Sequence, residues 1–371
     1  MESSRFLLVQ LIGPHEHAQE ARQNMQETES LVGTYGGVVV EKLVQHRIHP
    51  HPNTYIGSGK VEEIRLKLKT QKIEVVLING LVKPSQLFRM ERQWWNQNSK
   101  IKVWDRLDLI LAIFEKHAHS QEAKLQIELA RIAHSGPRIY GLGGTVLSGQ
   151  RGGIGQRGGG GETNIEMERR RMKQQEAAIR RQLAKLESQK QRRILYRQER
   201  GFGPVALVGY TSAGKTTLFN ALTGKQKETR TKLFTTLDTA VGKMIFEKGQ
   251  LPVLVADTIG FINHLPVQLV EAFRSTLMEA MAAKLLLHVI DATDRRRQEK
   301  SDTVEQILAD LKITQPLVRV YTKMDLVSPA RDKQIRREAK TARGWCVSAT
   351  SHLGVTELKR FVASQLISDH N

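Results

Sequence analysis

The sequence predicts an α/β protein in three parts. These are a small N-terminal α/β domain (residues 1–118), a basic helical hairpin (residues 119–201) and a second α/β domain with a mainly parallel sheet (residues 202–371). Short apolar runs alternate with helical patterns in the first and last parts, as in folds where helices connect parallel strands. A charged stretch with a seven-residue apolar repeat separates them. A length of 371 residues suits two or three domains.

The N-terminal part contains short strands rich in aliphatic and β-branched residues, which favour extended structure. We predict strands at residues 6–12, 36–43 and 73–78, and helices at residues 16–31, at residues 60–68 and from Pro84 onward. Gly57-Ser58-Gly59-Lys60 stands before the second of these helices. It is interpreted as a tight turn into the helix, with a nucleotide-binding loop as the alternative.

The middle part is predicted to form an antiparallel helical hairpin. Residues 119–135 have the pattern of an amphipathic helix, and residues 166–200 that of a long charged helix. The long helix carries an apolar seam with heptad spacing at Ile165, Met172, Ile179, Leu183 and Leu186. The helix at 119–135 is the nearest partner for this seam, although pairing between two chains would also cover it. We expect a monomer.

A glycine-rich segment, residues 141–161, lies between the two helices. It is either a flexible linker or a loop whose backbone approaches RNA closely. Residues 138–201 hold 15 Lys/Arg against 6 Asp/Glu, about half of the chain's net charge of +19. An excess of this size favours a polyanionic partner. We therefore predict RNA contacts at Arg151, Arg157, Arg169, Arg170, Arg171, Arg180 and Arg181.

Composition excludes several classes of protein. A single cysteine, Cys346, rules out a disulfide framework and a multi-cysteine zinc site. No apolar run approaches eighteen residues, and the N-terminus lacks a signal-peptide pattern. We expect a cytoplasmic protein with no membrane span.

The last part begins with a strand that runs directly into a G-x4-G-K-T loop and a helix. In this context the loop is typical of phosphate binding, because its glycines and the helix N-terminus turn backbone N–H groups toward the anion. The lysine reaches the β- and γ-phosphates, and the threonine after it holds Mg²⁺. The predicted phosphate contacts are Gly209, Tyr210, Thr211, Ser212, Ala213, Gly214, Lys215, Thr216 and Thr217.

Two further segments are predicted to complete the phosphate side of the site. Phe234, Thr235 and Thr236 lie in a polar stretch where a threonine can close over Mg²⁺ and the γ-phosphate. Asp257 ends an apolar strand and can hold Mg²⁺, and the Gly260 amide can meet the γ-phosphate. The predicted Mg²⁺ ligands are thus Thr216, Thr236 and Asp257, and the predicted catalytic groups are Lys215, Thr236 and Gly260.

The base side is predicted from two strand ends further along the chain. Thr322-Lys323-Met324-Asp325 follows one strand, where Asp325 can accept two hydrogen bonds from guanine and the Lys323 stem can lie over the base. Ser348 and Ala349 follow the next strand, and their backbone can contact guanine O6. This set favours GTP over ATP.

In this order the motifs resemble those of the translation-factor-related P-loop GTPases. That family's base motif usually begins with an asparagine that ties the base loop to the phosphate loop. This chain has Thr322, whose hydroxyl can take that role. Phe261 stands where many small GTPases have the glutamine that orients the attacking water. We therefore predict GTP hydrolysis that is slow alone and stimulated by a partner.

The upstream half narrows the resemblance to the HflX family of ribosome-associated GTPases, over about residues 5–368. The matching stretches are residues 51–61 (HPNTYIGSGKV), 104–106 (WDR), 122–130 (EAKLQIELA), 160–162 (GGE), 233–238 (LFTTLD) and 257–262 (DTIGFI). The resemblance implies binding to the large ribosomal subunit and its rRNA, and dissociation of stalled or idle ribosomes into subunits.

Two other functions remain open. One is a GTPase that assists assembly of the large subunit and never splits finished ribosomes. The other is a nucleotide-gated RNA-remodelling protein with an additional ATP site in the N-terminal domain, where Gly57-Ser58-Gly59-Lys60 is the candidate loop.

Overall fold

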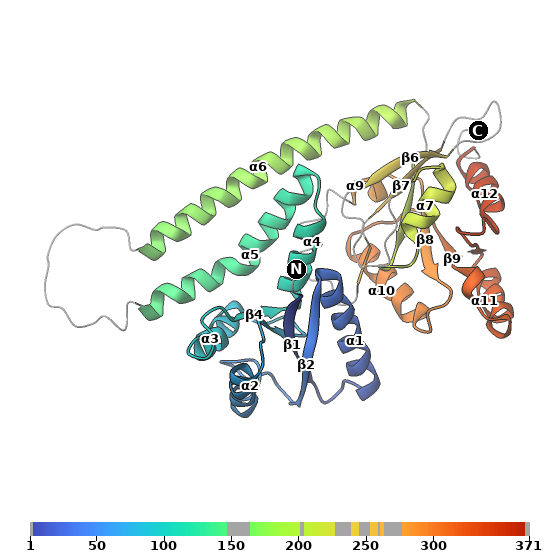
Figure 1. The fold of residues 1–371 in the computed structure, drawn as a ribbon. Coiled ribbons are helices and arrows are strands. Elements are labelled where there is room, and N and C mark those ends of the chain that lie inside the picture. Colours follow the sequence, from blue (N-terminus) through green and yellow to red (C-terminus); the bar gives the residue numbers. More distant parts are fainter. Residues whose placement is uncertain are drawn as a thin grey trace, which may run out of the picture. The chain divides into compact units, whose positions relative to one another are not determined.

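The computed structural model describes residues 3–146, 164–200, 204–226, 239–244, 253–258, 260–262 and 277–367. It confirms a mixed α/β fold with a parallel-sheet C-terminal domain and a long helix (Figure 1). The chain forms two compact units, residues 1–116 with 124–183 and residues 117–123 with 184–371. The boundary between the units falls inside the long helix. The division into three domains therefore stays a prediction.

The described residues of the first unit include a four-stranded parallel sheet in the order β2-β1-β3-β4. Its strands are β1 (Ser4–Ile12), β2 (Gly37–His46), β3 (Val75–Ile78) and β4 (Lys102–Asp105). The helices that follow them are α1 (Ala18–Tyr35), α2 (Ser58–Thr70), α3 (Pro84–Trp94) and α4 (Arg106–His117). The sequence analysis missed β4, because four residues that include a lysine and an aspartate carry no strand pattern of their own.

Both faces of this sheet are covered, so its central strands are apolar without alternation. Phe6 and its three neighbours to Val9 are fully buried in β1. The polar helix α1 packs through polar side chains: the Thr28 hydroxyl donates to Asn79 Oδ1 at 2.6 Å, and Arg106 donates to Thr28 Oγ1 at 3.0 Å. Buried polar groups are tolerated when they bond to one another, which explains a helix with a weak apolar pattern.

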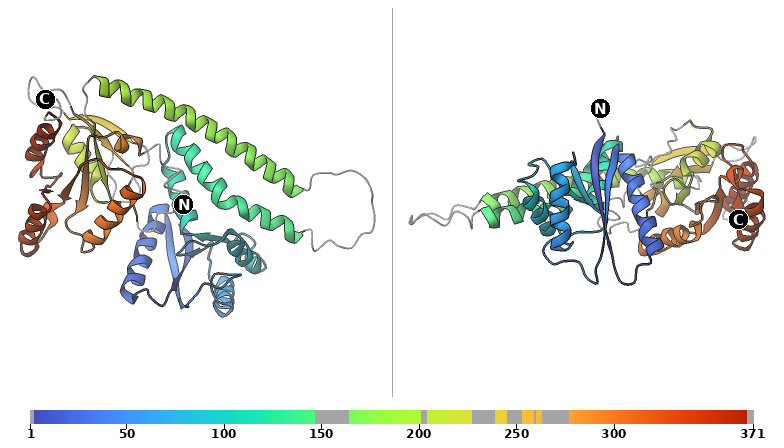
Figure 2. Two further views of the ribbon diagram at one scale, coloured as in Figure 1. Left: turned by 180° about the vertical axis from the view of Figure 1, so that it is seen from behind. Right: turned by 60° about the horizontal axis from the view of Figure 1, so that its bottom comes forward.

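α5 (Gln121–Val146) and α6 (Asn164–Glu199) run side by side (Figures 1 and 2). Gln175 Nε2 donates to Glu128 Oε1 at 2.6 Å, whereas Lys190 pairs with Glu122 at 3.6 Å. The later residue of α6 thus pairs with the earlier residue of α5, so the two helices are antiparallel. On α6 the predicted seam is buried at Ile179 and Leu183.

The expected end of the first hairpin helix was wrong. α5 continues from the predicted 119–135 through Gly141 to Val146, into the segment assigned to the glycine-rich loop. A nucleated helix gains one hydrogen bond with each added residue, and this offsets the entropic cost of glycine.

Among the helices that the structure describes, none combines the length and the apolar character of a membrane span.

The described residues of the second unit include a six-stranded sheet in the order β10-β9-β8-β5-β7-β6, in which β6 alone is antiparallel to its neighbour. Its strands are β5 (Pro204–Gly209), β6 (Ala240–Met244), β7 (Val253–Asp257), β8 (Leu285–Asp291), β9 (Leu317–Thr322) and β10 (Trp345–Cys346). The helices are α7 (Lys215–Thr223), α9 (Met278–Met281), α10 (Arg297–Asp310), α11 (Pro329–Thr341), α12 (Val355–Ile367) and the short 3-10 helix η2 (Met324–Leu326).

A buried histidine in this unit lies beside an ion pair. His288 on β8 is 1% exposed and lies 3.5 Å from Glu305 Oε1 on α10, which Arg319 also contacts at 2.7 Å. Hydrogen bonds from His288 and Arg319 lower the pKa of Glu305 to about 2. Burial lowers the pKa of His288, so its ring is held in a neutral form beside that carboxylate.

Candidate functional site

The phosphate loop occupies the turn between β5 and α7, at the carboxyl end of the parallel strands. Gly214 has φ +92° and Ser212 has φ +60°, and these left-handed residues fold the backbone into a cradle before α7 begins. At Gly209 a Cβ would lie 2.4 Å from the Val289 carbonyl oxygen on β8. The first glycine of the motif is therefore required by the close approach of a neighbouring strand.

Lys215 points into this cradle. Its side chain is buried, and Nζ donates to the carbonyl oxygens of Gly209 at 3.1 Å and Tyr210 at 2.7 Å. Burial lowers the pKa of Lys215 to about 8, although the Asp257 carboxylate opposes the shift. The ammonium thus sits within the curve of the loop, where it can meet phosphate oxygens.

The two predicted Mg²⁺ ligands that the structure describes are brought together. Thr216 Oγ1 on α7 donates to Asp257 Oδ2 at the end of β7, at 3.0 Å. Hydroxyl and carboxylate oxygens are the hard ligands that Mg²⁺ prefers, so this pair fits the ion. The third predicted ligand, Thr236, lies outside the described residues, as do Phe234 and Thr235.

The segment that follows β7 and contains Gly260 and Phe261, here called the second switch segment, is joined to the phosphate loop by its backbone. The Thr211 N–H donates to the Phe261 carbonyl at 2.8 Å, and the Phe261 N–H donates to the Gly209 carbonyl at 3.1 Å. At Gly260 a Cβ would lie 2.8 Å from Thr211 Cγ2 and 3.1 Å from Lys215 Nζ. Position 260 therefore needs a glycine. The apolar Phe261 ring is buried and cannot orient water.

On the base side, Thr322 does tie the two loops together. Its Oγ1 donates to the Ala213 carbonyl in the phosphate loop at 2.6 Å, which confirms the role predicted for the hydroxyl. Lys323 Nζ donates to the Ser212 carbonyl at 2.9 Å and to Asp291 Oδ2 at 2.7 Å. No sequence pattern indicated that Asp291, at the end of β8, pairs with this lysine.

Asp325 lies beside the segment that follows β10. The Thr350 hydroxyl donates to Asp325 Oδ2 at 3.2 Å. Hydrogen bonds from Ser348 and Thr350 lower the pKa of Asp325, so its carboxylate stays ionised and can accept hydrogen bonds. Met324 N–H also donates to the Val347 carbonyl at 3.3 Å. Thr350 was not predicted, because one threonine in a turn carries no signal.

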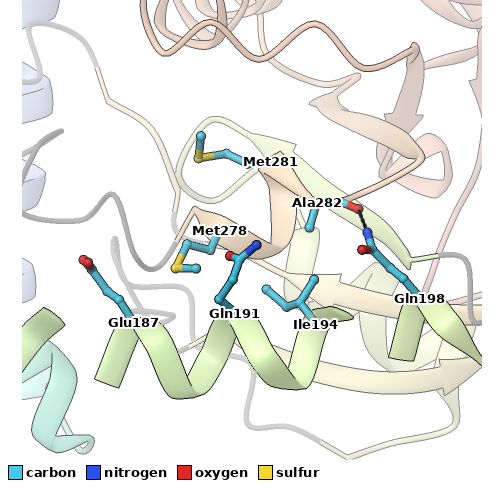
Figure 3. Close-up of a pocket in the computed structure, with 7 residues that line it drawn as sticks. All are labelled: Glu187, Gln191, Ile194, Gln198, Met278, Met281 and Ala282. Carbon is cyan, nitrogen blue, oxygen red and sulfur yellow. Dashed lines mark hydrogen bonds between the residues drawn. The ribbon is translucent and has the colours of Figure 1, made fainter. Parts of the chain in front are cut away.

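Sequence reasoning also missed the attachment of α6 to α9. Arg197 NH2 lies 2.6 Å from the buried carboxylate of Glu279. Gln198 Nε2 donates to the Ala282 carbonyl at 3.1 Å (Figure 3). A cavity of about 470 Å³ lies beside this contact, lined by Glu187, Gln191, Ile194, Gln198, Met278, Met281 and Ala282. The end of the long helix is thus fixed to the element that follows the second switch segment.

The predicted RNA-binding arginines of α6 are exposed: Arg169, Arg170, Arg171, Arg180 and Arg181. Within the helix, Arg180 pairs with Glu176 at 2.8 Å and Arg171 with Glu168 at 3.7 Å. Arg151 and Arg157 lie outside the described residues.

Gly57 and Gly59 in the first unit lie where the chain turns into α2. The Gly57 N–H donates to Gln45 Oε1 at 2.8 Å, and Lys60 Nζ bonds to Glu63 Oε2 at 2.6 Å. Lys60 is therefore held on its own helix, unlike Lys215, which points into a backbone cradle. This geometry favours the interpretation as a turn.

Three family models match consecutive parts of the chain. They are described as GTP-binding GTPase N-terminal (residues 22–115), GTP-binding GTPase middle region (residues 117–200) and 50S ribosome-binding GTPase (residues 204–323). The crystal structure of SsGBP in complex with GDP has the same fold, with a TM-score of 0.54 and 23% identity over 98% of this chain and 99% of that one.

Curated relatives named GTPase HflX match over most of the chain. The protein from Caldanaerobacter subterraneus is 37% identical over 99% of this chain and 82% of its own length. The protein from Escherichia coli is 37% identical over 93% of this chain and 79% of its own length. With the phosphate loop and the base-side residues in place, the chain is a GTP-binding protein and a GTP hydrolase, and it belongs to the HflX family of GTPases.

Proposed function

We propose that the protein binds the large ribosomal subunit and dissociates stalled or idle ribosomes into subunits in its GTP-bound state. The observation that carries this proposal is the exposed arginine row of α6 on a helix that is anchored, through Arg197, to the GTPase domain. A basic helix can contact rRNA phosphates, and its anchor lets the nucleotide state act on it. The family description of a 50S ribosome-binding GTPase supports the same partner.

The geometry of the described residues supports the proposed site roles. Lys215 binds the β- and γ-phosphates with the backbone N–H groups of the phosphate loop, and Thr216 and Asp257 hold Mg²⁺. Thr236 is proposed to close over the ion. Asp325 accepts hydrogen bonds from guanine. Mg²⁺ supplies charge neutralisation between the phosphates.

Hydrolysis is proposed to be slow until the ribosome is bound. The buried Phe261 ring leaves the second switch segment without a polar side chain at the position where many GTPases orient water. Bound GTP orders the switch segments, and hydrolysis releases them. α9 follows the second switch segment in the chain, so Arg197 and Glu279 are placed to transmit that change to α6.

The proposed working form is a monomer in the cytoplasm. Ile179 and Leu183 of the apolar seam are already buried within one chain, which removes the main reason for that seam to pair with a second copy.

Sedimentation of intact ribosomes with the protein and GTP tests the proposal. We expect subunits with GTP, and few with GDP or with the Lys215→Ala variant, which loses nucleotide binding. The double variant Arg170→Glu with Arg181→Glu should weaken subunit binding, more so at higher salt, and leave GTP hydrolysis in the absence of ribosomes unchanged. The charge-matched control Arg22→Glu with Arg92→Glu should bind normally, since both arginines are exposed outside α6.

Two results would change the conclusion. Binding to free large subunits without splitting of intact ribosomes would favour the assembly role. No binding to either particle would refute the ribosome as partner and leave the GTPase assignment in place.

A further inference from the structure

Three metal-ligating side chains meet in the first unit, far from the nucleotide site in the sequence. Asp105 ends β4, Asp108 lies in the first turn of α4, and His134 comes from α5 (Figure 1). His134 Nε2 lies 3.2 Å from Asp105 Oδ1 and 3.5 Å from Asp108 Oδ1. The side chains are 0%, 11% and 10% exposed for Asp105, Asp108 and His134. This is the one such group found among the described residues.

The two carboxylates are held in place by the backbone. The Asp105 N–H donates to Asp108 Oδ2 at 3.1 Å, and the Asp108 N–H donates to Asp105 Oδ1 at 2.9 Å. The Val82 N–H adds a contact to Asp105 Oδ2 at 3.3 Å. These bonds preorganise both acids at the junction of β4 and α4, with an oxygen of each directed at the imidazole.

The imidazole nitrogen is the second, independent observation. Within the described part of the chain, His134 Nε2 has no partner with hydrogen-bond geometry, although it is buried and faces two carboxylate oxygens. A polar atom in this position favours a cation placed between the three groups. A tetrahedral zinc ion with ligand distances of about 2.0–2.1 Å keeps its ligand atoms about 3.3 Å apart, close to the spacing seen here.

The local potential also favours a cation. Two carboxylates and a neutral imidazole balance the charge of one divalent ion. An imidazole ligand favours zinc over magnesium or calcium, which prefer oxygen ligands alone.

We propose that Asp105, Asp108 and His134 bind one Zn²⁺ ion, with water as the fourth ligand. The ion joins α5 to the junction of β4 and α4 and so fixes the base of the helical hairpin within the first unit. This site is distinct from the Mg²⁺ site at Thr216 and Asp257 and does not depend on the proposed ribosomal function.

Cobalt substitution of the full-length protein tests the site directly. The metal-free protein is titrated with Co²⁺ in excess Mg²⁺ and GDP, so that the nucleotide site is filled, and visible absorption is recorded. We expect one Co²⁺ per chain with the strong absorption of a tetrahedral ion, displaced by one equivalent of Zn²⁺. Asp108→Asn, which keeps the shape of the side chain, and His134→Ala should both lose this signal. The control His49→Ala, at an exposed histidine, should keep it.

Three outcomes would overturn the proposal. One is the absence of stoichiometric Co²⁺ binding. Another is a spectrum that is the same in wild type and in both ligand variants. The third is that Asp108→Asn lowers the thermal midpoint by the same amount with and without Zn²⁺. That result would mean that His134 and the carboxylates form only an ion pair.

Discussion

Removing the Thr322 hydroxyl should weaken nucleotide binding more than it weakens the fold. In Thr322→Val the side-chain volume is kept, but the bond to the Ala213 carbonyl is lost, and with it the 3.1 Å bond to the Ile290 carbonyl. Thr322 is 2% exposed, so water does not easily replace the donor. The Ala213 carbonyl belongs to the phosphate loop, and its partner lies 109 residues away in sequence. The bond therefore holds two halves of the nucleotide site together.

The magnitude follows from the burial of this bond. Loss of a partner by a buried polar group costs about 1–2 kcal/mol at a site of this kind. If that free energy is expressed in nucleotide binding, the GDP dissociation constant rises about 5- to 30-fold, since 1.4 kcal/mol is about a factor of ten. Thr322→Ser keeps the hydroxyl and should stay within about twofold of wild type.

Fluorescent GDP titration measures the effect, and thermal unfolding serves as the companion readout. Thr223→Val is the matched control, because Thr223 Oγ1 donates to the Phe219 carbonyl at 2.7 Å at the far end of α7. It should lower the thermal midpoint with little change in GDP affinity. Equal GDP affinity for Thr322→Val and wild type would refute the reasoning, as would an equal loss in Thr223→Val.

Three further predictions concern the same unit. Asp325→Asn should lower GTP affinity at least about tenfold and raise affinity for xanthosine triphosphate, measured by competition, because it exchanges a carboxylate acceptor for a donor. Arg197→Ala should leave GDP affinity within about twofold and remove ribosome-stimulated hydrolysis, since Glu279 lies outside the nucleotide site; unchanged stimulation would contradict the coupling. Hydrogen bonds from His288 and a neighbouring arginine lower the pKa of Glu305 to about 2 in the folded state. The ionised carboxylate therefore stabilises the folded protein fully above its unfolded-state pKa, and this contribution is lost as pH falls from about 5 toward 2. Glu305→Gln should therefore flatten the acid-unfolding profile in that range, and an unchanged profile would show that other groups set it.

Local patterns predicted much of the fold. Residues 75–78 and 204–208 are continuous apolar runs, and β3 and β5 form there because strands covered on both faces need no alternation. β4 and β6 were missed because short strands with charged or small residues are stabilised by pairing with a neighbour, a contact that a single sequence does not reveal. The continuation of α5 past Gly141 was missed for a related reason, since helix propagation outweighed residue preference.

The candidate site likewise has some contacts that the sequence predicts and others that it does not. The phosphate loop is contiguous, so its spacing alone indicates the geometry around Lys215. The Thr216–Asp257 pair could be predicted because Asp257 ends β7 and Thr216 lies in the first turn of the helix that follows the adjacent strand β5. Asp291 with Lys323, and Thr350 with Asp325, are 32 and 25 residues apart. Neither pair has a sequence signal, since each forms only where strand ends and loops converge.

By itself, the amino-acid sequence determined the class of chemistry: a phosphate loop, an aspartate that is predicted to select guanine, and a basic helix, each encoded by neighbouring residues at fixed spacing. Only the tertiary structure decided that Thr322 ties the two loops together, that Arg197 anchors α6 to Glu279, and that His134 faces two aspartates. These contacts join residues distant in sequence. They depend on strand order and helix packing, which are set by the burial of the whole chain rather than by any local pattern.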